Sequence, residues 1–137
     1  MISVTKNFRF EACHFLPSYV GACHNLHGHS YKLSVTVTGN VQTNGGNKGM
    51  IIDFKDLKRI VNDCIIDKYD HSYLNEHFVN PTAEVMVEEF GIELHKHLQG
   101  KYTLLSVKLW ETEDSYAEYT PEYYDNLLGH ILRPATV

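Results

Sequence analysis

Three histidines and a cysteine lie within CHNLHGHSYKLSVTV, residues 23–37, where they could bind a metal ion or carry out acid–base chemistry. His27 and His29 are two residues apart, so on a β-strand both imidazoles project to the same side. His14 has the parity of the apolar face of an earlier alternating segment, which makes it a natural third ligand. Three neutral imidazoles with an open fourth position suit zinc. The alternative is a group of solvent-facing turn histidines, because a single His-x-His pair is a weak motif.

Two further groups of residues could take part in proton transfer. Cys23 is either a fourth zinc ligand, a small buried hydrophobic residue or a free active-site thiol. To act as a base, its thiol would need a pKa below the usual value of about 8.5. Asp70 and His71 are adjacent, and a carboxylate can orient a neighbouring imidazole for proton transfer. The alternative for this pair is a polar helix terminus.

Glu111 continues the apolar parity of Leu105, Val107 and Leu109 in a predicted strand, so its carboxylate is expected to point inward. A buried carboxylate is costly without partners. A guanidine-like edge of a ligand would satisfy both of its oxygens. Alternatively, the strand ends by Trp110 and the carboxylate is solvated.

The elements that must position these residues follow from hydrophobic periodicity. In chain order, the pattern predicts strands over 2–15 and 29–39, helices over 54–69 and 80–98, and strands over 102–112 and 115–120. Asp53 is a suitable N-cap, Gly100 a helix stop, and the residues after Pro121 a short helix or turn. This order predicts an α+β fold, with a four-stranded antiparallel sheet and two helices on one face. The bare second face predicts oligomerisation.

The composition limits the class of protein. The 137 residues are expected to form one domain (1–137), with 43% hydrophobic residues and 21% charged residues, as in ordinary soluble proteins. A net charge of −5 argues against a nucleic-acid or membrane-surface binder but allows an anionic small molecule. The three cysteines show no paired spacing, and no signal peptide or membrane-spanning run is visible. A reducing, cytoplasmic location is expected.

Six motifs, taken together and in order, resemble the superfamily of 6-pyruvoyl-tetrahydropterin synthase and 6-carboxy-tetrahydropterin synthase, which has the tunnelling fold. They are FRFEACH, CHNLHGHSY, GMIIDFKDLK, DHSYLN, NPTAE and WETEDSYAEY, and they extend over nearly the full chain. One motif alone would be weak, but six in register are specific. Tyr69 stands where the family usually has Leu, and Cys13 occupies a small-residue position. Neither departure touches a matched catalytic position.

The resemblance implies a zinc ion bound by His14, His27 and His29. It also implies that Cys23 is the catalytic thiol. The implied substrate is 7,8-dihydroneopterin triphosphate.

The remaining matched positions imply a second proton-transfer pair and a pterin anchor. Asp70 and His71 form the pair, and Glu111 holds the amino and N–H edge of the pterin. Thr82, within NPTAE, is expected near the same edge. The family assembly is a homohexamer, a dimer of trimers, in which Asp70 and His71 could serve the zinc of a neighbouring chain.

The spacing of the cysteine motif favours one branch of the superfamily. The animal-type pyruvoyl enzymes resemble Cys-x5-His-Gly-His, whereas the carboxy enzymes of the queuosine pathway have Cys-x3-His-Gly-His, as in residues 23–29. A further subgroup has Glu immediately before His-Gly-His, where this chain has Leu26. The carboxy branch forms 6-carboxy-5,6,7,8-tetrahydropterin, acetaldehyde and triphosphate. The alternatives are a pyruvoyl synthase, which eliminates triphosphate without releasing acetaldehyde, and a non-catalytic zinc-binding oligomer.

Overall fold

The structure, a computed structural model, describes residues 1–132. The elements in chain order are β1 (Ser3–His14), η1 (Ala22–His24), β2 (His27–Thr38), α1 (Phe54–Val61), η2 (Asn62–Ile66), α2 (Asp67–Tyr69), β3 (Ser72–Tyr73), η3 (Leu74–Glu76), α3 (Ala83–Leu98), β4 (Thr103–Thr112), β5 (Ser115–Tyr119) and α4 (Pro121–Leu132). η1 and η3 are 3₁₀ turns, and η2 is a π-helical segment. Within the described part of the chain, every helix is too short or too polar to cross a bilayer.

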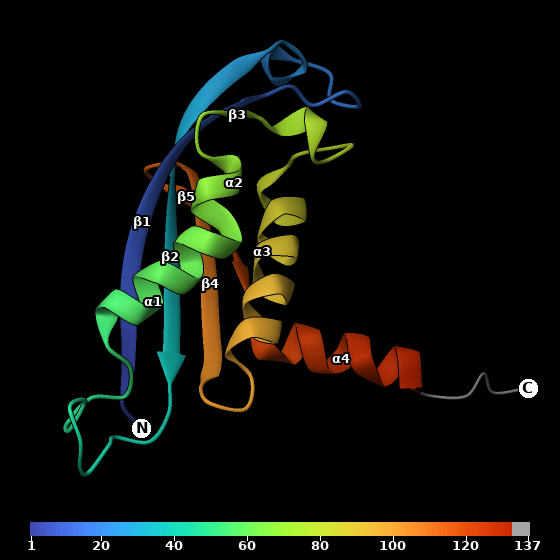
Figure 1. Cartoon of the computed structure of the whole chain (residues 1–137). Coiled ribbons are helices and arrows are strands. Elements are labelled where there is room, and N and C mark those ends of the chain that lie inside the picture. The colour runs from blue at the N-terminus through green and yellow to red at the C-terminus, as the bar shows by residue number, and fades with distance from the viewer. Residues whose placement is uncertain (133–137) are drawn as a thin grey trace, which may run out of the picture.

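Five strands form one mixed sheet in the order β3-β1-β2-β4-β5 (Figure 1). The pairs β1–β2, β2–β4 and β4–β5 are antiparallel, as the sequence predicted. β3 adds a parallel partner at the outer edge of β1. The prediction of four antiparallel strands therefore missed a strand. The reason is that Ser72 and Tyr73 alone are too short a segment for alternation to be visible in the sequence.

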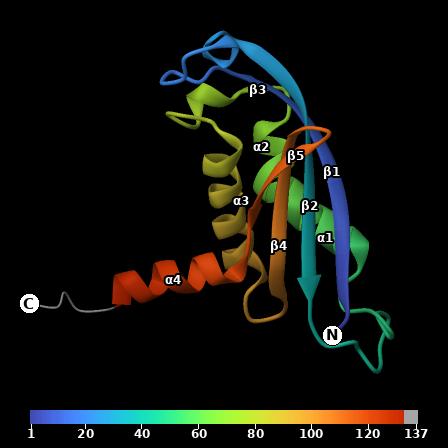
Figure 2. The same cartoon turned by 180° about the vertical axis from the view of Figure 1, so that it is seen from behind.

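The helices α1 and α3 lie against the same face of the sheet, and the view from behind shows the strands in front of them (Figures 1 and 2). Asp53 caps α1, because its Oδ1 accepts a hydrogen bond from the backbone N–H of Lys55 at 2.9 Å. α3 ends at Leu98, and Gly100 follows with φ of 89°, a left-handed conformation suited to glycine. The helix after Pro121, α4, is twelve residues long and projects sideways from the base of the sheet.

The core lies between the sheet and these helices. Phe10 of β1 stacks on Tyr31 of β2, with ring centroids 4.8 Å apart, and meets the edge of Phe90 of α3 at 6.2 Å. All three side chains are at most 1% exposed. This aromatic layer holds the end of β1 and the beginning of β2 in one fixed relation.

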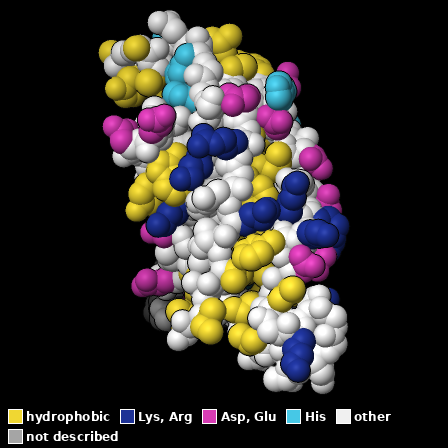
Figure 3. All heavy atoms as spheres, turned by 90° about the vertical axis from the view of Figure 1, so that its left-hand side faces the viewer, with side chains coloured by type: hydrophobic (Ala, Val, Ile, Leu, Met, Phe, Trp, Pro, Cys, Tyr) yellow, Lys and Arg dark blue, Asp and Glu magenta, His cyan; other side chains and the backbone are white. Residues whose placement is uncertain are grey.

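The surface mixes charges of both signs. On the side seen in Figure 3, lysine and arginine side chains occupy the middle of the face, and acidic and hydrophobic side chains lie among and around them. This side of the molecule therefore carries no continuous basic surface of the kind that a nucleic-acid backbone requires.

Candidate active site

Three histidines meet where β1 ends and β2 begins. The antiparallel register pairs His14 with His27, and Ala12 with His29, so the three imidazoles project to the same side. The His14 and His27 Nε2 atoms are 3.0 Å apart, and the His29 ring centroid is 5.0 Å and 4.8 Å from those of His14 and His27. One ligand atom from each residue lies within 4.8 Å of the others. The structure thus brings together the three residues that sequence parity selected.

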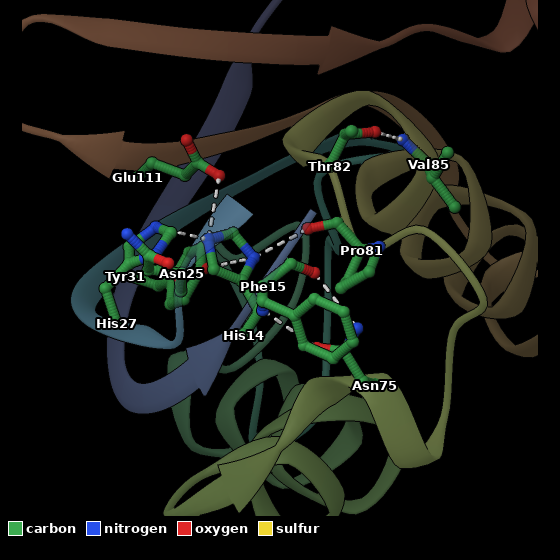
Figure 4. A network of polar contacts seen from close by, with 10 residues as sticks. All are labelled: His14, Phe15, Asn25, His27, Tyr31, Asn75, Pro81, Thr82, Val85 and Glu111. Atoms are coloured by element: carbon green, nitrogen blue, oxygen red, sulfur yellow. Dashed lines mark hydrogen bonds and ion pairs between the residues drawn. The ribbon is translucent and has the colours of Figure 1, made fainter. Parts of the chain in front are cut away.

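Backbone carbonyls fix which ring nitrogen faces the cluster (Figure 4). His14 Nδ1 is 2.8 Å from the carbonyl oxygen of Pro81, and His27 Nδ1 is 2.7 Å from that of Asn25. A carbonyl oxygen only accepts hydrogen bonds, so both Nδ1 atoms carry the proton. Both Nε2 atoms therefore present lone pairs to the centre of the cluster. In metal sites, a hydrogen bond from the ring nitrogen that does not bind the metal holds the imidazole in its orientation. The two Nδ1–carbonyl contacts are of this kind.

The donor set fits a zinc ion. Zinc with Zn–N bonds of about 2.0–2.1 Å holds tetrahedral nitrogen ligands roughly 3.3 Å apart, close to the observed 3.0 Å between His14 and His27. Two unprotonated nitrogens at this distance repel each other unless they share a cation. Burial lowers the pKa of His14, and burial together with the neighbouring imidazoles lowers that of His29 to about 4. Near neutral pH both rings are in the uncharged form that binds metal.

Glu111 reaches the cluster from the end of β4. Its Oε1 lies 3.8 Å from His14 Nε2, and its side chain is 30% exposed (Figure 4). Burial raises the pKa of Glu111, and the negative charge of Glu84 raises it further. The carboxylate therefore points inward, as its parity predicted, and it has no cationic side chain as a partner among the described residues. Such a group is suited to a ligand that presents two N–H donors.

Asp70 and His71 form a second polar pair at the outer edge of β1. Asp70 Oδ1 is 3.0 Å from His71 Nδ1 and accepts a hydrogen bond from the Glu11 backbone N–H at 2.9 Å. The contact with that N–H, followed by those with His71, lowers the pKa of Asp70. His71 has a φ of 59°, unusual for a non-glycine residue, and its side chain is 79% exposed. In the described residues, no hydrogen bond or ion pair joins this pair to the three histidines.

His71 and His29 do line one shallow pocket. The pocket has a volume of about 570 Å³, and its walls come from the ends of β1 and β2 and from β3. Glu11 and Cys13 also line it. Because Glu11 and Cys13 alternate with Ala12 and His14 along β1, this pocket lies on the face of the sheet opposite to the three imidazoles, and it does not bring the His71 side chain to the cluster.

Cys23 and Thr82 occupy turns that flank the cluster. Cys23 is half-buried in η1, and its carbonyl oxygen accepts a hydrogen bond from the Leu16 backbone N–H at 2.9 Å. Its thiol is not among the atoms that form the three-histidine group. Thr82 Oγ1 accepts a hydrogen bond from the Val85 backbone N–H at 3.2 Å and so caps α3 (Figure 4). The hydroxyl predicted to lie near the substrate thus has a structural partner.

Sequence reasoning missed the residues that hold this site in place. Asn75 accepts a hydrogen bond from the Phe15 backbone N–H and donates one to the Phe15 carbonyl, both at 3.0 Å, which fixes the chain directly after His14. Asn75 is the last residue of the motif DHSYLN, so the motif contained the signal although no role was assigned to it. The backbone carbonyls of Asn25 and Pro81, which accept hydrogen bonds from the histidines, could not be predicted from the sequence, because every residue has a backbone carbonyl.

The family model, the related sequences and the similar solved structure all indicate the same family. The family model described as 6-pyruvoyl tetrahydropterin synthase matches residues 3–122. A 6-carboxy-5,6,7,8-tetrahydropterin synthase of Haemophilus influenzae is 32% identical over 140 residues, covering 87% of this chain and 99% of the relative. A putative enzyme of the same name from Archaeoglobus fulgidus is 38% identical, covering 80% and 87%. A Caenorhabditis elegans 6-pyruvoyl tetrahydropterin synthase has a similar structure, with a TM-score of 0.75 at 23% identity, covering 87% and 94%.

Proposed function

The chain belongs to the 6-pyruvoyl tetrahydropterin synthase family, and we propose that it is an enzyme of the carboxy branch. The proposed reaction converts 7,8-dihydroneopterin triphosphate and one water into 6-carboxy-5,6,7,8-tetrahydropterin, acetaldehyde and triphosphate, as a step of queuosine biosynthesis in the cytoplasm. The names of relatives that are 30–38% identical over most of the chain support this branch. The Cys-x3-His-Gly-His spacing of residues 23–29 supports it independently.

The observation that carries the proposal is the position of one half-buried carboxylate beside three converging imidazoles. Glu111 Oε1 lies 3.8 Å from His14 Nε2 and has no cationic side chain beside it in the described residues. A flat ligand with an amino group and a ring N–H, as in a pterin, would give the carboxylate two charge-assisted hydrogen bonds. The same contact would place the other end of the ligand over the histidines.

The zinc ion is proposed to be held by His14, His27 and His29, whose donor set fits it. When bound, zinc supplies Lewis acidity toward the side-chain hydroxyls of the substrate. Glu111 fixes the register of the ring, so that the reacting carbons lie over the cluster. Pro81 keeps the proton of His14 on Nδ1, away from the substrate.

Proton transfer is assigned to Cys23 and to the pair Asp70 and His71. Cys23, as a thiolate, would remove the proton from the side-chain carbon next to the ring. His71 would act as the complementary acid or base, oriented by the Asp70 carboxylate at 3.0 Å. The 79% exposure of the His71 side chain and its separation from the histidine cluster support a site completed by a second chain.

Assembly into a homohexamer, a dimer of trimers, is part of the proposal. Both edges of the sheet, β3 and β5, lack a further strand in the described residues, and exposed edges of this kind invite pairing with another chain. Arg9, Lys32 and Trp110 lie side by side across β1, β2 and β4, with Lys32 Nζ 4.5 Å from the Trp110 ring centroid. In a barrel formed by the sheets of several chains, the face that carries these three side chains would be enclosed.

The experiment uses zinc-loaded protein and 7,8-dihydroneopterin triphosphate, with the pterin products identified by mass. Wild-type protein is compared with Cys23→Ala and with Cys13→Ala, a second half-buried free cysteine as the matched control. We expect 6-carboxy-5,6,7,8-tetrahydropterin from the wild type and from Cys13→Ala, and a loss of about 100-fold or more in Cys23→Ala. A 6-pyruvoyl product would contradict the assignment to the carboxy branch. A fully active Cys23→Ala would overturn the role of the thiol.

A further inference from the structure

A second group of metal-ligand side chains lies between η2 and α3, away from the histidine cluster. Cys64, Glu93 and His97 each place one ligand atom within 4.8 Å of the other two. His97 lies fifteen residues along the chain from Thr82, the cap of α3, or roughly 20 Å along the helix axis. This group is therefore separate from the proposed catalytic centre, and nothing in the proposed reaction uses it.

The local structure is suited to holding a metal. Glu93 and His97 are four residues apart on α3, so their side chains lie on the same face of the helix. His97 Nδ1 is 2.9 Å from the Glu93 carbonyl oxygen and 3.6 Å from Glu93 Oε1, so Nδ1 carries the ring proton and Nε2 is the nitrogen with a lone pair for a metal. Cys64 lies in the π-helical segment Asn62–Ile66, a type of distortion that is frequent at functional sites.

The surroundings favour a cation. A pocket of about 270 Å³ lies over the group, and Asp63 and Glu89 line it together with the three side chains. Lys68 also lines the pocket and is its one basic side chain apart from His97. The carboxylates outnumber the cations around the thiol, so a divalent cation would relieve the repulsion among them.

A cysteine, a histidine and a carboxylate could instead form a nucleophilic triad, and the electrostatics argue against that alternative. Burial raises the pKa of Cys64, and the charges of Glu93 and Asp63 raise it further. A reactive cysteine needs a lowered pKa and a positively charged environment. The thiol is therefore poorly suited to attack a substrate.

We propose that Cys64, Glu93 and His97 bind a second divalent transition-metal ion, of which zinc is the best match. One thiolate, one imidazole and one carboxylate are the three types of protein ligand that zinc accepts, with a fourth position left for water. Magnesium and calcium prefer oxygen ligands alone and would not use the thiol. The ion would tie the π-helical segment to the last turns of α3.

The test uses cobalt(II) as the probe, because a cobalt–thiolate bond gives charge-transfer absorption in the near ultraviolet and a cobalt–imidazole bond does not. Purified metal-free protein is titrated with cobalt(II), and bound metal is counted by mass spectrometry. We expect about two equivalents per chain, with the thiolate band rising alongside one of them. Cys64→Ser and His97→Ala are expected to lose the band and about one equivalent. Cys13→Ser and His24→Ala serve as matched controls that keep both.

His97 is half-exposed, with 51% of its side chain accessible, so His97→Ala tests the site even if Cys64→Ser fails to fold. Cys23→Ser, tested only by absorption, shows whether the other cluster contributes to the band. A band that survives both Cys64→Ser and His97→Ala would overturn the proposal. So would a wild-type protein that binds about one equivalent without any thiolate band.

Discussion

The candidate site depends, at the scale of single residues, on where the ring protons of its histidines lie. His14 and His27 each hold an Nδ1 proton against a backbone carbonyl, at 2.8 Å and 2.7 Å. Both Nε2 atoms are thereby kept free to bind a cation. Glu111 approaches the same nitrogen of His14 from β4. The nitrogen assigned to the metal and the carboxylate assigned to the pterin therefore lie 3.8 Å apart in one site.

Removal of one imidazole tests the metal centre. His29→Ala leaves two ligands, and we expect zinc affinity to fall by more than about 100-fold. Removal of a group that only hydrogen-bonds to a metal ligand already lowers metal affinity by about 10- to 100-fold, and removal of a ligand itself should cost more. The measurement is zinc bound per chain after dialysis against a weak chelator. His24→Ala, an exposed histidine in the adjacent turn, should bind as much zinc as the wild type. Equal zinc content in both variants would contradict the assignment.

Neutralisation of Glu111 tests the pterin anchor. A hydrogen bond to a charged group contributes about 1.5–3 kcal/mol, so Glu111→Gln should raise KM by about 10- to 100-fold while zinc content stays unchanged. Glu113→Gln, an exposed residue of the same type two positions away, is the control. Steady-state kinetics with the pterin triphosphate gives the result. An unchanged KM in Glu111→Gln would remove Glu111 from the substrate site.

Parity was enough to select the three histidines and Glu111, because a strand forces alternate side chains onto one face. The same reasoning could not find the second candidate metal group. Cys64 belongs to the apolar stripe of one helix, and His97, two residues from His95 on another helix, suggested only a surface position. Their meeting depends on how η2 packs against α3, which no local pattern encodes.

At the scale of elements, α3 lies unusually close to β5. A Cβ added to Gly91 would lie 2.2 Å from the Tyr119 Cγ atom, a distance that no relaxed structure allows. Helix propensity alone would make a Gly→Ala change favourable by about 1 kcal/mol. Here the steric clash is expected to outweigh that gain, because overpacking costs about 1–3 kcal/mol or more.

The prediction is that Gly91→Ala lowers the free energy of unfolding, measured by urea denaturation at matched protein concentration. Gly129→Ala in α4 is the control, since its added Cβ meets no atom of the described residues within 4 Å, and it should be neutral or stabilising. In a Tyr119→Ala background the effect of Gly91→Ala should shrink or reverse. A stable Gly91→Ala in the wild-type background would show that α3 does not need this close approach.

The long elements could be predicted from the sequence, and the short ones could not. β1, β2 and α3 each have more than ten residues of clear periodicity. β3 has two residues, and the π-helical turn of η2 keeps the apolar spacing of an ordinary helix. Thr82, predicted near the substrate from a motif, caps α3. The motif identified Thr82 as a matched position, but it did not show which group the Thr82 hydroxyl contacts.

At the scale of the whole molecule, the proposed proton-transfer pair and the histidine cluster can belong to different chains of one site. If neighbouring chains share each site, His29→Ala and His71→Ala should each be inactive alone. Mixed oligomers of the two should recover about a quarter of wild-type activity, since random pairing leaves that fraction of sites with both intact residues. Subunit exchange followed by an activity assay measures this. Mixtures that stay inactive would place both groups within one chain.

The most direct measurement follows acetaldehyde and pterin products in the intact enzyme before zinc removal, after it, and after zinc is restored. The proposed chemistry predicts acetaldehyde and 6-carboxy-5,6,7,8-tetrahydropterin in about equal amounts, loss of both with the metal, and recovery of both with zinc. His29→Ala should not recover when zinc is added. Full turnover by metal-free protein, or a pterin product formed without acetaldehyde, would contradict a zinc-dependent carboxy synthase.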